Sequence, residues 1–347
     1  MSISDSIKAT TPLWLQRMYL VIRYQQTNVQ HLLVKLNNIF KKQSEIILTC
    51  DTRRIEELIK RTNVDVNGIF AGHTPLQAAA QNGHLDIIRL LIQHDVNLEI
   101  EDKDGDRAVH HAAFGDEAEV LELLAKSSVD LNARNKRRQT ALHIGVCKGH
   151  FDVCKTLLSN GAHPGIQDSD GDTPLHDAIS KRRDDLIIIL LEYNADVATC
   201  NNNGFNSIHH AALRGNSSVI ELILSKIQNR QWLVDEKKND GFTALHLATL
   251  NDHCLVAKLL LTKGNASINA QNISLQTALH LAVGRQHLQI VNLLCSKDAN
   301  VNLVDKDGDT YLYEALRHHT LLQLKQLQDV GDSERVCSHL RINYYLN

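Results

Sequence analysis

The stretch DSDGDTPLHDAISKRRDDLIIILLEYNADVATC, residues 168–200, contains one complete structural unit. The sequence DGD at 170–172 predicts a tight turn, and Thr173 followed by Pro174 is typical of a helix N-cap and first helical position. Apolar residues then recur at helical spacing in two short segments, which the polar run at 181–184 separates. Two short helices and a turn cannot bury their apolar side alone, so the unit needs neighbours of the same kind.

The same turn and helix start recur along the chain at a period close to 33 residues. The interval between turns is 33 residues except for 37 between Gly204 and Gly241 and 34 between Gly241 and Leu275. A tetrapeptide such as TPLQ, TALH or TPLH follows each turn and begins a short helix. The residues that mark the turn are Gly72, Gly105, Arg138, Gly171, Gly204, Gly241, Leu275 and Gly308.

With this period and these tetrapeptides, the sequence resembles the ankyrin-repeat family over roughly residues 50–330. The resemblance implies an all-α solenoid of about eight helix-turn-helix repeats, with hairpin fingers along one side. We expect one ankyrin-repeat domain at 46–330, beginning with a degraded repeat at 46–67. Its last unit, at 305–330, has a polar outer face that is typical of a cap.

The two ends of the chain do not follow the repeat. Residues 6–44 contain no acidic residue, and the apolar spacing at 29–40 predicts an amphipathic helix within an N-terminal extension at 1–45. We expect this helix to cap the first repeat; a mitochondrial transit peptide is the alternative. The C-terminal tail at 331–347 has no repeat register.

Composition limits the kinds of partner that we expect. The 37 Lys and Arg residues against 40 Asp and Glu residues give a net charge of −3, so no global field favours nucleic acid. The seven cysteines stand singly without a CxxC pair, which is typical of a reduced cytosolic or nuclear protein, and we expect a cytoplasmic location. No apolar run approaches the ~18 residues that a membrane span requires.

Most of the 19 histidines fall at repeated positions, which indicates a structural role. No HExxH and no zinc-type Cys/His spacing occurs, and DKDGD at 102–106 has its Gly fourth rather than sixth, which excludes a calcium loop of the EF-hand type. We therefore expect no metal, no cofactor and no catalytic residue, and we find no catalytic module. The repeated histidines are His110, His143, His176, His209, His246 and His280 in the tetrapeptides, and His84, His150, His253 and His287 after the first helices.

Basic and aromatic side chains at the fingers are the candidate partner contacts. A positive stripe for an acidic peptide is one interpretation of the basic clusters, and solvated surface charge is the other. The long interval before Gly241 contains Trp232, which predicts an enlarged finger. We expect protein partners to bind along the fingers and first helices, and the candidate residues are Lys136, Arg137, Arg138, Arg182, Phe205, Trp232, Lys237, Lys238 and Phe242.

The second regular repeat departs from the pattern. Arg107 replaces the capping Thr, and an Arg side chain cannot accept a backbone hydrogen bond, so the helix loses an interaction worth ~1 kcal/mol. The sequence AAFG at 112–115 also predicts a shortened first helix. These features make the repeat a candidate weak point or recognition site.

Several of these unusual features resemble the mind bomb family of RING-type ubiquitin ligases. That family ubiquitinates Notch ligands and promotes their endocytosis, with the ankyrin array between ligand-binding and RING modules. The resemblance implies that this chain is the scaffold segment of such a ligase; a stand-alone adaptor or competitive inhibitor without a RING is the alternative. The matching stretches are EDKDGDRAVHHAAFGDE (101–117), LNARNKRRQTALH (131–143), GDTPLHDAISKRRDD (171–185), NNNGFNSIHHAALRGN (201–216), WLVDEKKNDGFTALHLA (232–248) and DKDGDTYLYEALRHHTLLQLKQLQDV (305–330).

Overall fold

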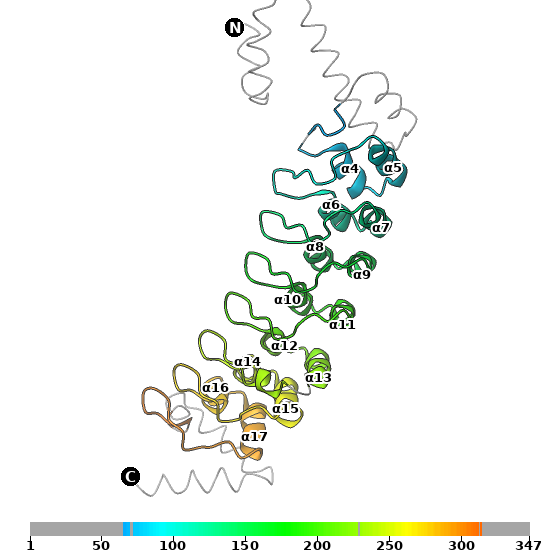
Figure 1. The fold of residues 1–347 in the computed structure, drawn as a ribbon. Helices are drawn as coiled ribbons and strands as arrows, with labels where there is room; N and C mark the ends of the chain where they lie inside the picture. Colours follow the sequence, from blue (N-terminus) through cyan, green and yellow to red (C-terminus); the bar gives the residue numbers. More distant parts are fainter. Residues whose placement is uncertain (1–64, 70–71, 228–229, 312, 314–347) are drawn as a thin grey trace, which may run out of the picture.

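The computed structural model describes residues 65–69, 72–227, 230–311 and 313. Within this range the chain forms a curved stack of seven helix pairs with loops along one side (Figure 1). The described residues contain no strand, and an isolated bridge joins Val304 and Thr310. The prediction of an all-α solenoid is therefore confirmed. The predicted extension at 1–45, residues 46–64 of the predicted degraded repeat, the final cap beyond residue 313 and the tail at 331–347 lie outside the described residues.

The helices form two parallel columns (Figure 1). The first helices are α4 (Pro75–Gln81), α6 (Ala108–Gly115), α8 (Ala141–Lys148), α10 (Pro174–Ser180), α12 (Ser207–Arg214), α14 (Ala244–Leu250) and α16 (Ala278–Gly284). The second helices are α5 (Leu85–Gln93), α7 (Ala118–Lys126), α9 (Phe151–Ser159), α11 (Asp184–Glu192), α13 (Ser217–Lys226), α15 (Cys254–Thr262) and α17 (Leu288–Ser296). A short 3-10 helix, η1 (Gln231–Val234), follows α13.

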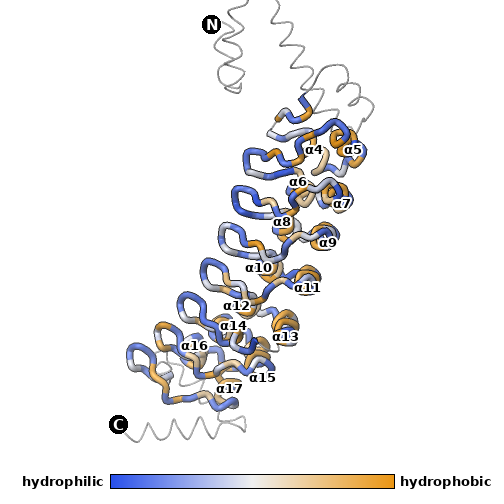
Figure 2. Tube along the Cα trace, in the orientation of Figure 1, coloured by the Kyte–Doolittle hydropathy of each residue, from blue (hydrophilic) through white to orange (hydrophobic). Residues whose placement is uncertain are grey.

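The core is a continuous aliphatic layer between the two columns. In the central repeat Leu175, Ile179, Leu186 and Ile187 are fully buried. Each such side chain contributes about 1.5–3 kcal/mol when it leaves water. Apolar residues line the helices while the loops are polar (Figure 2). Because each repeat buries its apolar face against the next, each added repeat extends the same core.

The tetrapeptide histidines connect neighbouring repeats. The backbone N–H of Thr173 donates to Nδ1 of His176 at 3.1 Å, and Nε2 of His176 then donates to the carbonyl of Phe205 in the next finger at 3.0 Å. Gln77 makes the same two kinds of bond, accepting from Thr74 N–H at 2.8 Å and donating to the Asp106 carbonyl at 3.0 Å. The structural role predicted for these histidines is therefore confirmed.

Most of the described fingers are turns that the side chain of the first residue holds closed. Oδ1 of Asp168 accepts the backbone N–H groups of Asp170 at 2.9 Å and Asp172 at 3.0 Å. Gly171 has a φ of 78°, and a Cβ there would lie 2.7 Å from the backbone nitrogen of Asn202. Glycine is needed at this position because the next finger approaches so closely.

The predicted shortening of the second regular repeat is wrong. Helix α6 has eight residues, as do α8 and α12, and Gly115 is its last residue. Asp116 takes the left-handed C-cap conformation with a φ of 66°. Gly115 is needed for a different reason, because a Cβ there would lie 2.1 Å from the carbonyl oxygen of Gln81.

The prediction of an enlarged Trp232 finger is also wrong. The finger before α14 closes with a bond from Lys238 N–H to the Phe242 carbonyl at 3.0 Å, as the preceding finger closes from Asn201 to Phe205 at 2.9 Å. The extra residues lie between the end of α13 and Asp235, and they include η1. The backbone hydrogen bonds between neighbouring fingers fix the size of each finger, so the extra residues are accommodated outside it.

Candidate protein-interaction surface

Phe205, Lys238, Phe242 and Ile273 form a cluster over three successive fingers, which we call the aromatic finger patch. The ammonium of Lys238 lies 4.8 Å from the centroid of the Phe205 ring and 5.6 Å from that of Phe242. Ile273 comes from the following finger and is 67% exposed. A Cβ on Gly241 would lie 3.0 Å from Cγ1 of Ile273, so that side chain sits directly over the finger of Phe242.

The patch is held in place before any partner arrives. Both phenylalanine rings are half-buried and pack against the aliphatic core. The ammonium of Lys238 also pairs with the Asp240 carboxylate, whose side chain is half exposed. Lys237 is fixed to the neighbouring finger, since its Nζ donates to the Gln271 carbonyl at 2.7 Å. Preorganised aromatic and cationic groups lose little entropy on binding, which favours them as partner contacts.

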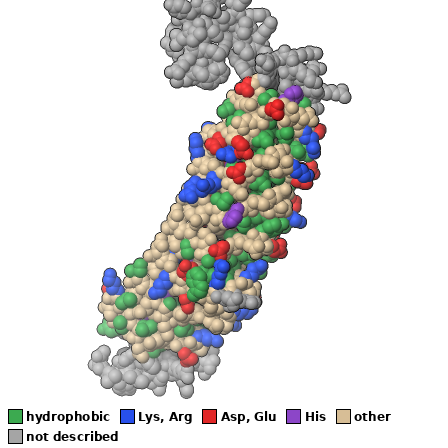
Figure 3. Space-filling view, viewed as in Figure 1, with side chains coloured by type: hydrophobic (Ala, Val, Ile, Leu, Met, Phe, Trp, Pro, Cys, Tyr) green, Lys and Arg blue, Asp and Glu red, His purple; other side chains and the backbone are tan. Residues whose placement is uncertain are grey.

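The basic finger tip, Lys136, Arg137 and Arg138, lies on an earlier finger than the patch. All three side chains are exposed. The ammonium of Lys136 bonds back to the Lys103 carbonyl, and Arg138 has a φ of 58° where most fingers have glycine. Basic and acidic side chains are interspersed on the face drawn in Figure 3.

Two other candidates lie apart from the fingers. Arg182 is in the turn after α10, where its guanidinium donates to the Arg214 carbonyl of the next repeat. Trp232 is in η1 and is 59% exposed. The structure thus brings Phe205, Lys238 and Phe242 together, and it places Arg182 and Trp232 at other parts of the repeat.

Sequence reasoning missed Ile273 and Leu275. Leu275 is 45% exposed and has a φ of 56°, so it occupies the left-handed position that glycine fills in most fingers. The signal was present as LQT in place of GDT or GFT. Exposed aliphatic side chains at a finger tip extend the apolar surface beside Phe242.

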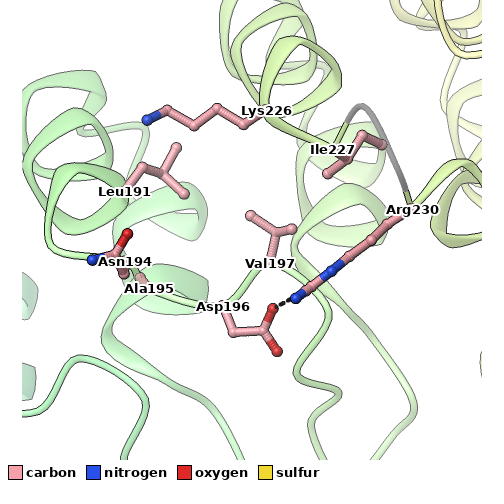
Figure 4. Close-up of a pocket in the computed structure, with 8 residues that line it drawn as sticks. All are labelled: Leu191, Asn194, Ala195, Asp196, Val197, Lys226, Ile227 and Arg230. Atoms are coloured by element: carbon pink, nitrogen blue, oxygen red, sulfur yellow. Dashed lines mark hydrogen bonds and ion pairs between the residues drawn. The ribbon is translucent and has the colours of Figure 1, made fainter.

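A shallow pocket lies between the ends of α11 and α13 (Figure 4). Nη1 of Arg230 and Oδ1 of Asp196, which are 2.8 Å apart, form an ion pair at its rim. Leu191, Val197 and Ile227 provide the apolar lining. Both charged side chains are about half exposed, so water screens the pair and its contribution to stability is small.

The described cysteines have no activated thiol. Burial raises the pKa of both Cys147 and Cys154 to about 12, and that of Cys295 to about 11. Burial also raises the pKa of the Asp177 carboxyl to about 7. The thiols of Cys147, Cys154 and Cys295 stay protonated at neutral pH, which makes them poor nucleophiles.

Comparison with known proteins agrees with this architecture. Family models described as "Ankyrin repeats (3 copies)" match residues 46–135, 114–199 and 194–272, and one described as "Ankyrin repeats (many copies)" matches 259–314. The chain therefore belongs to the ankyrin-repeat family. No helix among the described residues has the length and hydropathy that crossing a bilayer would require.

The chain is also similar to one particular ligase. It is 63% identical over 279 residues to the "E3 ubiquitin-protein ligase mind-bomb" of Drosophila melanogaster, which confirms the resemblance to that family. The match covers 80% of this chain but 23% of the ligase, so the chain spans about a quarter of the length of that relative. Among solved structures, the human ASB11 ankyrin repeat domain matches with a TM-score of 0.51 and 28% identity, covering 60% of this chain and 90% of that one.

Proposed function

We propose that this chain is the protein-interaction scaffold of a mind-bomb-type ubiquitin ligase and that it binds its partner through the aromatic finger patch. The observation that carries the proposal is the seating of Lys238 between Phe205 and Phe242 beside the exposed Ile273. Ankyrin repeats are protein-binding modules, and the 63% identity to the mind-bomb ligase supports the assignment to this kind of ligase.

The chemistry of the patch favours a peptide that carries a carboxylate next to an apolar side chain. The carboxylate would replace Asp240 as the partner of Lys238, and the apolar group would cover Ile273 and Phe242. The basic finger tip then adds long-range attraction for an acidic segment. We place this activity in the cytoplasm, in the ubiquitination of Notch ligands that precedes their endocytosis.

A domain exchange tests the proposal. Residues 46–330 of this chain replace the matching ankyrin segment of the Drosophila ligase, and ubiquitination of the Notch ligand Delta is measured in cells that lack the native ligase. We expect the exchanged ligase to be active, and Ile273→Asp with Lys238→Glu to reduce ubiquitination at least about tenfold, because both attractive contacts are lost.

Phe151→Ala is the matched control, since Phe151 is an exposed phenylalanine on the second helix α9, away from the fingers. Equal activity of the patch variant and the control would rule out this patch as the binding site. A melting curve of each purified chain separates loss of binding from loss of fold.

A stand-alone adaptor or inhibitor is the second candidate. This candidate differs from the first in having no RING, a module that needs clustered Cys and His ligands for zinc. An antibody against residues 305–330 distinguishes the two on an immunoblot of source tissue. A band near 38.9 kDa supports the adaptor, and a much larger band alone supports the ligase.

A further inference from the structure

We propose that His73, Asp102 and His111 form a binding site for a divalent transition-metal ion, and that Zn²⁺ is the ion that suits it best. The three residues come from the finger before α4, from the following finger and from α6. The proposal does not depend on the proposed function, and it departs from the sequence prediction of no metal.

The donor atoms face one another at suitable distances. Oδ2 of Asp102 lies 3.1 Å from Nε2 of His111 and 3.7 Å from Nδ1 of His73. All three ligand atoms lie within 4.8 Å of one another. Two ligands of a tetrahedral zinc ion, each about 2.0–2.2 Å from the metal, are roughly 3.4 Å apart. A small adjustment therefore brings all three atoms to a single ion.

His111 is positioned by a second contact in the way that metal-binding histidines commonly are. Its Nδ1 lies 3.2 Å from the amide oxygen Oε1 of Gln81, which accepts hydrogen bonds. The tautomer with its proton on Nδ1 donates to this oxygen and leaves the lone pair of Nε2 directed at the Asp102 carboxylate. Without a metal ion, the other tautomer donates from Nε2 to Oδ2 of Asp102 at 3.1 Å, and a metal ion bound between the two atoms would replace that proton.

His73 and Asp102 each have one donor atom to offer. Nδ1 of His73 is buried and has no hydrogen-bond partner among the described residues. The side chain of Asp102 is 3% exposed, and its Oδ1 already accepts the backbone N–H groups of Asp104 at 2.8 Å and Asp106 at 2.9 Å. Oδ2 of Asp102 is thus directed at the two imidazoles, while Oδ1 keeps the finger closed.

The corresponding positions three repeats later show what a satisfied cluster looks like. There Asp172, Asn201 and His210 occupy the places of His73, Asp102 and His111. The Asn201 amide donates to Oδ1 of Asp172 at 2.8 Å, and Nδ1 of His210 lies 3.2 Å from the Ser180 hydroxyl. The nearby His176 uses both ring nitrogens for its repeat contacts. Since the protein supplies these partners, we propose no metal at that cluster.

The ligand set selects the kind of ion. Two imidazoles and one carboxylate suit Zn²⁺, whereas Ca²⁺ and Mg²⁺ prefer oxygen ligands only. Three protein ligands leave a fourth position for water or for a side chain of a partner. The ion would join two fingers to α6, the helix whose N-cap residue Arg107 makes no side-chain hydrogen bond to the helix backbone.

Zinc titration of the untagged chain, in competition with a chromogenic chelator, tests the proposal. We expect one zinc ion per chain. His73→Gln and Asp102→Asn are each expected to weaken binding at least about tenfold, because each removes a ligand. Both variants should fold, since Gln139 and Gln276 occupy the position of His73 in other repeats, and Asn135 and Asn201 occupy that of Asp102.

His163→Gln is the matched control, because His163 is an exposed histidine outside the cluster. Cobalt substitution gives an independent readout, since its visible absorption reports coordination and should disappear in the two ligand variants while their melting curves persist. Equal zinc binding by the variants and the control, or no stoichiometric binding by the native chain, would overturn the proposal.

Discussion

The clusters His73/Asp102/His111 and Asp172/Asn201/His210 lie at the same three places of the repeat but have different chemistry. In the central cluster an amide donates to a carboxylate at 2.8 Å. In the amino-terminal cluster the donor atoms of two imidazoles face one carboxylate oxygen. Two repeats of one backbone geometry thus carry a hydrogen-bonded contact in one case and a set of metal ligands in the other.

The aromatic finger patch extends the comparison to the next repeat. Phe205 stands at the position of Asp172, and Lys238 stands at that of Asn201. There the contact between fingers is a cation over an aromatic ring, 4.8 Å from its centroid. The helices and the backbone hydrogen bonds between fingers maintain the backbone conformation. The side chains at these three positions can therefore differ between repeats without changing the fold.

Acidification should have the largest effect. Burial, with a smaller contribution from neighbouring His176, lowers the pKa of His210 to about 3, and burial lowers the pKa of both His209 and His246 to about 4. The unfolded chain takes up these protons near pH 6.5, so stability is complete above that pH and falls below it. At pH 5 we expect each histidine to cost about 2 kcal/mol in the free energy of unfolding.

Urea unfolding at pH 7 and pH 5 measures this loss. His210→Leu is the matched variant, because Leu247 and Leu281 occupy the same position in later repeats. It should reduce the difference between the two pH values by about 2 kcal/mol. An unchanged difference would mean that His210 is protonated in the folded chain.

Removing the finger-closing residue should have the next largest effect. Oδ1 of Asn201 accepts the N–H groups of Asn203 and Phe205, both at 3.0 Å, and its amide donates to Asp172. Asn201→Ala removes three hydrogen bonds, so we expect a loss of about 3 kcal/mol in urea unfolding. Asp102→Ala should cost about as much in metal-free buffer. A much smaller loss at either position would show that water replaces the turn bonds.

Substitutions at the helix caps should change the free energy of unfolding by a smaller amount. Arg107→Thr adds a capping side chain worth about 1 kcal/mol but removes the pairs of Arg107 with Glu99 and Glu101. Those pairs are partly exposed and worth about 0.5 kcal/mol together, so we expect a net gain near 0.5 kcal/mol in thermal unfolding. Thr243→Ala removes a hydroxyl that accepts the backbone N–H of His246, the third residue of α14, and should cost about 1 kcal/mol. Equal effects at both helices would contradict the assigned difference in capping.

Converting the central cluster should change stability least, but it should change metal binding. Asp172→His combined with Asn201→Asp reproduces the amino-terminal ligand set beside the existing His210. We expect the free energy of unfolding in metal-free buffer to change by less than about 1 kcal/mol, since the turn bonds are kept. Zinc titration should rise from one ion to two per chain. A constant stoichiometry would show that the residue types alone do not make the site.

The amino-acid pattern alone predicts the repeat, its period and the starts of its first helices. Local chemistry fixes these features: Thr173 and Pro174 begin a helix, Asp168 and Gly171 close a finger, and the apolar spacing decides which helix face is buried. The basic and aromatic finger residues were also recognisable as surface candidates, because most of them depart from the repeat pattern or lie at its turns.

The contacts between residues of different repeats depend on how the repeats stack in three dimensions. His73 and Asp102 are 29 residues apart, so no linear zinc spacing reveals them, and Lys238 contacts the ring of Phe205 from one full period further along the chain. The places of Gly115 and Trp232 were mispredicted for the same reason. Backbone hydrogen bonds between neighbouring fingers set the size of the finger after Trp232, and the contact of Gly115 with Gln81 sets the end of α6. Both are contacts between repeats, which local sequence does not encode.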